Sequence, residues 1–87
     1  MHERALIINL LRQVDRLAVA EGARKVTKVS VWLGALSHMS PEHFRHHFDQ
    51  DAAGSIAEGA ALDCVTSEDV TDPNATAVLL KSVEVET

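Results

Sequence analysis

Apolar residues recur at steps of three and four through the first quarter of the chain, which is the spacing of one face of an α-helix. The charged side chains of Arg4, Arg12 and Asp15 fall off this stripe. The pattern predicts a helix from residue 4 to about residue 21, ended by Gly22, because glycine readily takes the left-handed conformation that follows a helix. The stripe consists of Leu6, Ile7, Leu10, Leu11, Val14, Leu17 and Ala18.

A change from helical spacing to strict alternation marks the next segment, residues 25–33. Val29, Val31 and Leu33 fall on one side of the predicted strand, and Lys28, Ser30 and Trp32 fall on the other.

A second helix is predicted to open at Ser40-Pro41-Glu42, with a capping hydroxyl, proline in the first turn and an acid near the positive helix end. Phe44, Phe48 and Ala52 form its apolar face, and Gly54 ends it.

Two further strands follow, separated by the turn signal Asp72-Pro73-Asn74. Residues 62–66 predict a short strand with Leu62 and Cys64 on one side. Residues 78–86 predict a last strand with Val83 and Val85 facing inward.

The order helix, strand, helix, strand, strand predicts an α+β fold of two layers, with two helices on one face of a three-stranded sheet. A helical crossover makes the first two strands parallel, and the following turn makes the third antiparallel to the second. We expect the third strand in the middle. The outward residues, Trp32 among them, then leave a partly apolar open face on which a second copy or a partner would dock.

With 87 residues, the chain predicts a single domain, 1–87. Its one cysteine, Cys64, excludes an internal disulfide and every zinc motif built on paired cysteines. The net charge of −5 argues against nucleic-acid binding. The longest N-terminal apolar run, residues 5–11, is too short and too interrupted for a membrane span or a signal peptide, which leaves the cytoplasm as the expected location.

Histidines are the main chemical feature of the chain. His43 and His47 are four residues apart on the second predicted helix, a spacing that can chelate a transition metal. The plainer interpretation is that they are exposed helix residues, and the same holds for His46 and for His38 in the preceding loop. Cys64 is interpreted as a small inward hydrophobe. No nucleophile elbow or glycine-rich phosphate loop is present, so the sequence does not predict an enzyme.

His2 stands out because of its position. The Met1 amine, the backbone nitrogens of His2 and Glu3, and the His2 imidazole all lie within one short stretch of chain. Deprotonated amide nitrogens are strong ligands, and a tetragonal set of nitrogens suits Ni(II) or Cu(II).

Several short motifs follow one another along the chain. These are Met1-His2-Glu3, residues 21–29, the strand end Leu33-Gly34-Ala35-Leu36-Ser37, Pro41-Glu42 with Phe48, Ala57-Glu58-Gly59-Ala60 with Leu62, and residues 80–86. By their order and spacing, rather than by any one of them, the chain resembles the HypA/HybF family of hydrogenase maturation proteins, which are nickel-insertion accessory factors.

This resemblance implies a nickel-binding metallochaperone that assists nickel insertion during [NiFe]-hydrogenase maturation. It implies that Met1, His2 and Glu3 are the metal ligands. The implied partners are a HypB-like GTPase and the hydrogenase large subunit; some members of the family also serve urease.

The main departure from the family lies in residues 67–76. Family members carry a zinc ribbon with two CxxC pairs there, whereas this segment has no cysteine. We therefore expect Ni(II) but no zinc. Two interpretations of the function stay open. The chain is either a metallochaperone-like protein that holds nickel at its N-terminus and hands it on, or a zinc-less interaction module that keeps the fold without delivering metal.

Overall fold

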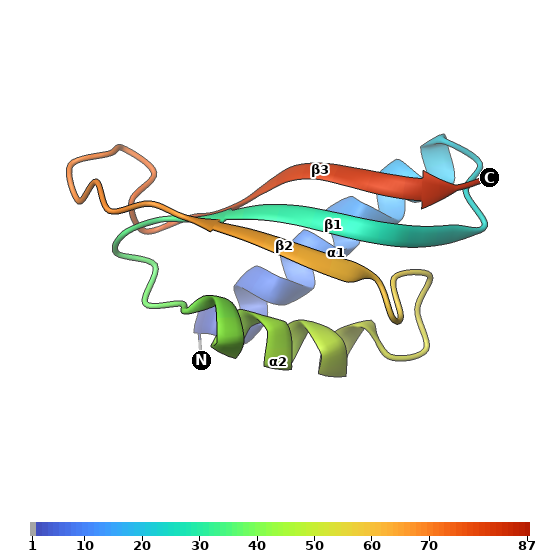
Figure 1. The fold of residues 1–87 in the computed structure, drawn as a ribbon, viewed down its shortest axis with the longest axis horizontal. Helices are drawn as coiled ribbons and strands as arrows, with labels where there is room; N and C mark the ends of the chain where they lie inside the picture. The colour runs from blue at the N-terminus through green and yellow to red at the C-terminus, as the bar shows by residue number, and fades with distance from the viewer. Residues whose placement is uncertain (1) are drawn as a thin grey trace.

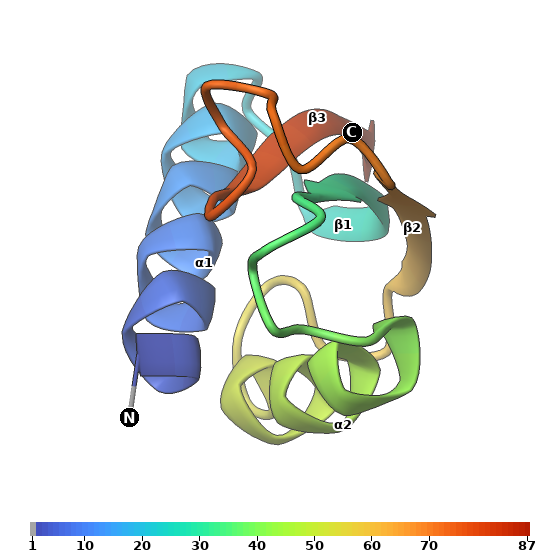
Figure 2. The ribbon, with the colours of Figure 1, turned by 90° about the vertical axis from the view of Figure 1, so that its left-hand side faces the viewer.

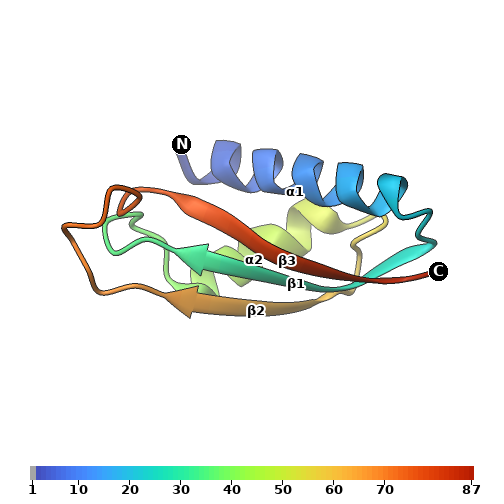
Figure 3. The same ribbon diagram turned by 90° about the horizontal axis from the view of Figure 1, so that it is seen from above.

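The computed structural model describes residues 2–87, with side chains from Arg4 onward. Its elements follow the predicted order of helix, strand, helix, strand, strand (Figure 1). Their bounds are α1 His2–Ala20, β1 Lys25–Leu33, α2 Pro41–Ala52, β2 Ala61–Thr66 and β3 Val78–Glu86. Both helices lie on one side of the sheet (Figures 2 and 3), which confirms the predicted two-layer α+β fold.

The stripe on α1 is buried along its centre and exposed at one margin. Ile7, Leu10, Val14 and Ala18 are at most 2% exposed, whereas Leu17 is 47% exposed. The apolar face is thus narrower than the sequence pattern indicated. The helix ends as predicted, because the N–H groups of Gly22 and Ala23 donate to the carbonyls of Val19 and Ala18 across a Gly22 with φ of 65°.

The strand order is β2-β1-β3, so the prediction that the third strand lies in the middle is wrong. β1 runs parallel to β2, as expected, and antiparallel to β3. The error came from assuming a tight turn between the last two strands. Residues 67–77 instead form a connection that passes the end of β1 and delivers β3 to its far edge (Figure 1).

Contacts at the end of β1 hold this connection in place. The N–H groups of Gly34 and Leu36 donate to the carbonyls of Ala77 and Ala75, at 2.9 and 2.7 Å. Gly34 is needed for this approach, since a Cβ at that position would collide with the Ala75 carbonyl. β1, hydrogen-bonded on both edges, becomes the centre of the sheet.

The pairing of β1 with β3 contains two register irregularities, one between Val26 and Lys28 and one between Ser30 and Val31. A bulge shifts the alternation of side chains by one residue. For this reason Val26 and Val29, which an unbroken alternation would place on opposite faces, are both fully buried.

The second helix begins as the sequence predicts. Ser40 is its N-cap, and the Ser40 Oγ accepts a hydrogen bond from the backbone N–H of His43 at 3.1 Å. Phe44, Phe48 and Ala52 form the buried face, and the two phenyl rings stack with centroids 6.2 Å apart. α2 is thereby fixed against the sheet and α1, with its opposite face toward solvent.

Candidate functional site

Of the ligands predicted from the N-terminal triplet, Met1 and the side chains of His2 and Glu3 lie outside the part of the chain that the structure describes. The backbone is described from His2 and the side chains from Arg4. What the structure gives is the setting: α1 begins at His2, and the first N–H groups of any α-helix have no acceptor within the helix. Backbone nitrogens at the start of this chain are therefore not needed for helical hydrogen bonds.

The start of α1 lies beside α2 (Figures 1 and 2). The Arg4 guanidinium approaches the Asp51 carboxylate at 3.9 Å, and a shallow groove of about 300 Å³ follows between the two helices. Arg12, Asp15 and Asp51 line this groove together with Ile8 and Leu11. The N-terminal turn is thus next to the helix that carries most of the histidines.

Three of these histidines form a cluster on α2. The rings of His43 and His47 have centroids 4.5 Å apart at an interplanar angle of 67°, and those of His46 and His47 are 5.7 Å apart. His43 and His46 are exposed and His47 is half-buried, and none of the three belongs to the buried face of α2. His38 stands apart in the preceding loop, with φ of 59°.

Cys64 is packed at the margin of the core rather than presented to solvent. Partial burial raises the pKa of its thiol, and the nearby Arg45 guanidinium opposes this shift without cancelling it. Arg45 is itself held by a hydrogen bond from Nη2 to the Leu62 carbonyl, 2.9 Å long. A thiol with a raised pKa is a poor nucleophile, which agrees with the interpretation of Cys64 as a small inward hydrophobe.

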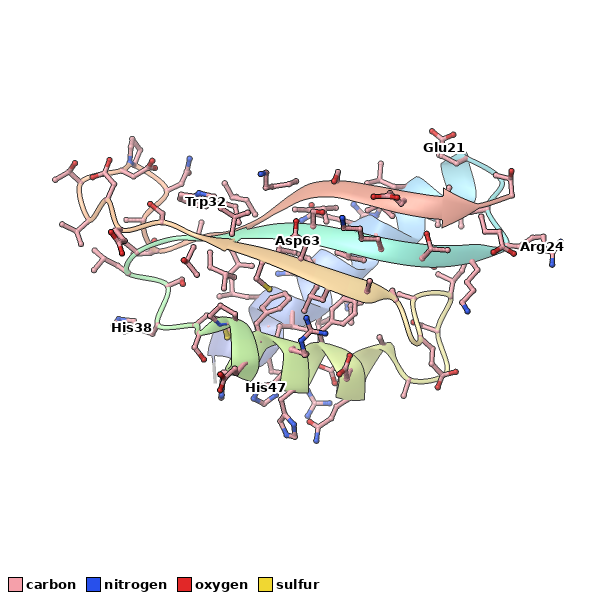
Figure 4. All side chains as sticks on the ribbon, viewed as in Figure 1. Glu21, Arg24, Trp32, His38, His47 and Asp63 are labelled. Atoms are coloured by element: carbon pink, nitrogen blue, oxygen red, sulfur yellow. The ribbon has the colours of Figure 1, made fainter. Side chains whose placement is uncertain are left out.

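The open face of the sheet has an apolar end that the sequence did not reveal in full. Trp32 pairs with Val65 on one side and with Leu79 on the other, and the two partners are 39% and 41% exposed. We call these three residues the Trp32 patch (Figure 4 labels Trp32). Alternation could place each residue on an outer face, but only the true strand order brings them together.

Among residues 4–87, no group of three or more His, Cys, Asp or Glu side chains is arranged to hold a metal ion. In the same part of the chain, no helix is long and apolar enough to cross a membrane.

Comparison with known proteins shows the family to which the chain belongs. A family model described as "Hydrogenase/urease nickel incorporation, metallochaperone, hypA" matches residues 1–73. The hydrogenase maturation factor HypA of Chlorobium limicola is 38% identical over 63 residues, covering 72% of this chain and 54% of that protein. The factor of the same name from Methanosarcina mazei is 42% identical over 62 residues, covering 71% and 45%.

The fold is similar to that of solved structures as well. The solution structure of the Ni metallochaperone HypA from Helicobacter pylori superposes with a TM-score of 0.79 at 18% identity, covering 97% of each chain. The matched region spans about half the length of the curated relatives. The sequence match to the family model ends at residue 73, inside the connection between β2 and β3.

Proposed function

Since the chain belongs to the HypA family of nickel metallochaperones, we propose that it binds one Ni(II) ion at its N-terminus and passes it on during [NiFe]-hydrogenase maturation. The observation that carries the proposal is that the family match begins at residue 1 and so includes Met1-His2-Glu3, directly at the start of α1. The proposed ligands are the Met1 amine, the backbone nitrogens of His2 and Glu3, and the His2 imidazole.

The chemistry of such a chelate follows from its donor set. Four nitrogens in one plane suit Ni(II). The amine and the imidazole must lose their protons to bind, and the two amides give up theirs only to the metal, so binding releases protons and strengthens as the pH rises. The start of a helix favours this arrangement because its first N–H groups have no carbonyl partner in the helix.

The partners we propose are a HypB-like GTPase and the hydrogenase large subunit, and we propose that no zinc is bound. Zinc ligation of the kind found in ribbons requires paired cysteines, and residues 67–77 contain none. A protein that kept the fold and its contacts but bound no nickel would instead be an interaction module, which is the outcome that the following experiment distinguishes.

The test is titration of Ni(II) into protein with a native, unmodified Met1. We expect one tightly bound ion per chain and the yellow colour of a diamagnetic square-planar complex. Changing His2→Ala, acetylating Met1 or adding a residue before it should each abolish most of the affinity, because each removes or displaces a ligand.

Glu3 provides a matched pair of variants. Glu3→Ala keeps the backbone N–H and should cost little, whereas Glu3→Pro lacks it and should be severe. Proline is tolerated in the first turn of a helix, so this variant should still fold. Unchanged nickel affinity after acetylation of Met1 would refute the N-terminal site.

A further inference from the structure

The pair His43 and His47 has the spacing of a chelate, and its rings are in contact. Residues four apart on a helix lie one above the other on the same face. The centroids of the two imidazoles are 4.5 Å apart and their planes are inclined at 67°. The rings thus meet edge to face on one side of the helix.

The two rings are close enough to reach one metal ion. A metal–imidazole bond of about 2.0–2.1 Å puts each ring centroid about 3.2 Å from the ion, so two rings at adjacent corners of a square or octahedron have centroids about 4.5 Å apart. The rings of the pair lie at this separation, and binding an ion requires them to turn a nitrogen of each toward it. The rings of His46 and His47, 5.7 Å apart, are too distant for the same geometry.

The helix beneath the pair is well fixed. Phe44 and Phe48, each one position after a histidine of the pair, are 0% and 1% exposed. At the start of the helix the backbone N–H of His43 is held by the Ser40 hydroxyl. Two ligands on one packed helix lose little backbone freedom on binding, which favours chelation over binding by independent imidazoles.

We propose that His43 and His47 form a second metal site, which takes a divalent first-row transition ion such as Ni(II), Cu(II) or Zn(II) through two adjacent imidazoles. Borderline-soft nitrogen donors select these ions over Mg(II) or Ca(II). Two imidazoles leave the other coordination positions of the ion to water or to further ligands, and among residues 4–87 no third His, Cys, Asp or Glu side chain is placed to occupy one. The site is therefore open, weaker than a four-nitrogen chelate, and quick to exchange its ion.

The histidine pair lies near the contact between α2 and the first turn of α1. His47 is one turn before Asp51, which the Arg4 side chain from the first turn of α1 approaches. A weakly held ion at the pair would thus be about one helical turn from the contact between α2 and the first turn of α1. The site itself does not depend on the N-terminal chelate, and the two are separable by experiment.

The experiment uses full-length protein whose Met1 is acetylated, which removes the N-terminal amine ligand. Titration with nickel chloride alone should give one weak site with a pale, paramagnetic complex that broadens the NMR signals of the His43 and His47 rings. His43→Gln and His47→Gln should each weaken nickel binding by about tenfold or more, because a single imidazole remains. Neither histidine belongs to the buried face of α2, so the far-UV spectrum should not change.

His46→Gln is the matched control, since it removes a neighbouring imidazole from the same helix and should leave the affinity within about twofold. Equal loss in all three variants, or no loss in His47→Gln, would overturn the proposal. Acetylated protein that binds no nickel, alongside unmodified protein that binds one ion, would refute the α2 site while leaving the N-terminal site intact. Weak nickel binding that survives acetylation and depends on His43 and His47 is the expected result. If unmodified protein binds nickel no more tightly than this, the N-terminal site is refuted and the α2 site stands.

Discussion

The two faces of the sheet differ although alternate residues of the same strands form them. On the face toward the helices, Val29, Val31 and Leu33 of β1 are at most 1% exposed. On the opposite face, Lys28, Ser30 and Trp32 are only half-buried. One strand therefore carries the centre of the core on one side and a surface without cover on the other.

The open face is itself divided. At one end the Lys28 ammonium lies 3.8 Å from the Glu84 carboxylate, a solvent-exposed ion pair of the kind that contributes at most about 1 kcal/mol. At the other end is the Trp32 patch. The inner face therefore supplies the buried core on which folding depends, whereas the outer face leaves apolar side chains exposed to solvent.

The largest effect should come from truncating the inner core. Phe44→Ala removes a ring that is fully buried and stacked on Phe48, so we expect a loss of about 3–5 kcal/mol in the free energy of unfolding. Urea unfolding followed by circular dichroism measures it. Phe44→Leu, which keeps most of the volume, should cost clearly less, and an equal cost for both variants would show that the ring packs less tightly than described.

A smaller effect on folding and a larger one on association are expected for the outer face. Trp32→Ala should change the free energy of unfolding by about 1 kcal/mol or less, because the side chain is half-buried and supports no helix. If a second copy or a partner covers the Trp32 patch, the same change should weaken that contact by tenfold or more, since aromatic anchors dominate such interfaces.

Sedimentation at several protein concentrations is the measurement for the homodimer. Ser30→Ala, on the same face but outside the Trp32 patch, is the control and should leave association unchanged. A protein that remains monomeric at all concentrations would exclude a second copy as the occupant.

Local signals predicted most of the fold. The Ser40 cap, the Gly22 stop and the alternation in residues 25–33 each depend on neighbours in the chain, and each is confirmed. The strand order could not be obtained in this way, because it depends on how residues 67–77 pack against the end of β1. The bulge that buries Val26 together with Val29 is likewise a property of pairing with β3.

Less of the candidate sites than of the fold could be predicted from the sequence. The spacing of His43 and His47 pointed to a chelating pair, but the sequence could not show how close the rings come. Of the Trp32 patch, the sequence predicted only Trp32 itself. Val65 and Leu79 become its neighbours through the strand order. The N-terminal ligands Met1, His2 and Glu3 stay a prediction from the triplet and the family.

The smallest expected effect is that of removing metal, and it tests whether the inner face alone is sufficient for folding. The core is built from the two helices and the sheet, and within residues 4–87 no group of three metal-ligating side chains is placed to hold an ion. A structural metal would contribute its binding free energy to folding, so stripping it would lower the melting temperature.

We therefore expect an excess of EDTA to leave the far-UV spectrum and the melting temperature unchanged, in the acetylated protein as in the native one. Adding Zn(II) back should not raise the melting temperature beyond the small shift that weak binding at His43 and His47 would give, and that shift should vanish in His47→Gln. A cooperative loss of structure in EDTA would mean that a metal, and not the packed face of the sheet, holds this chain together.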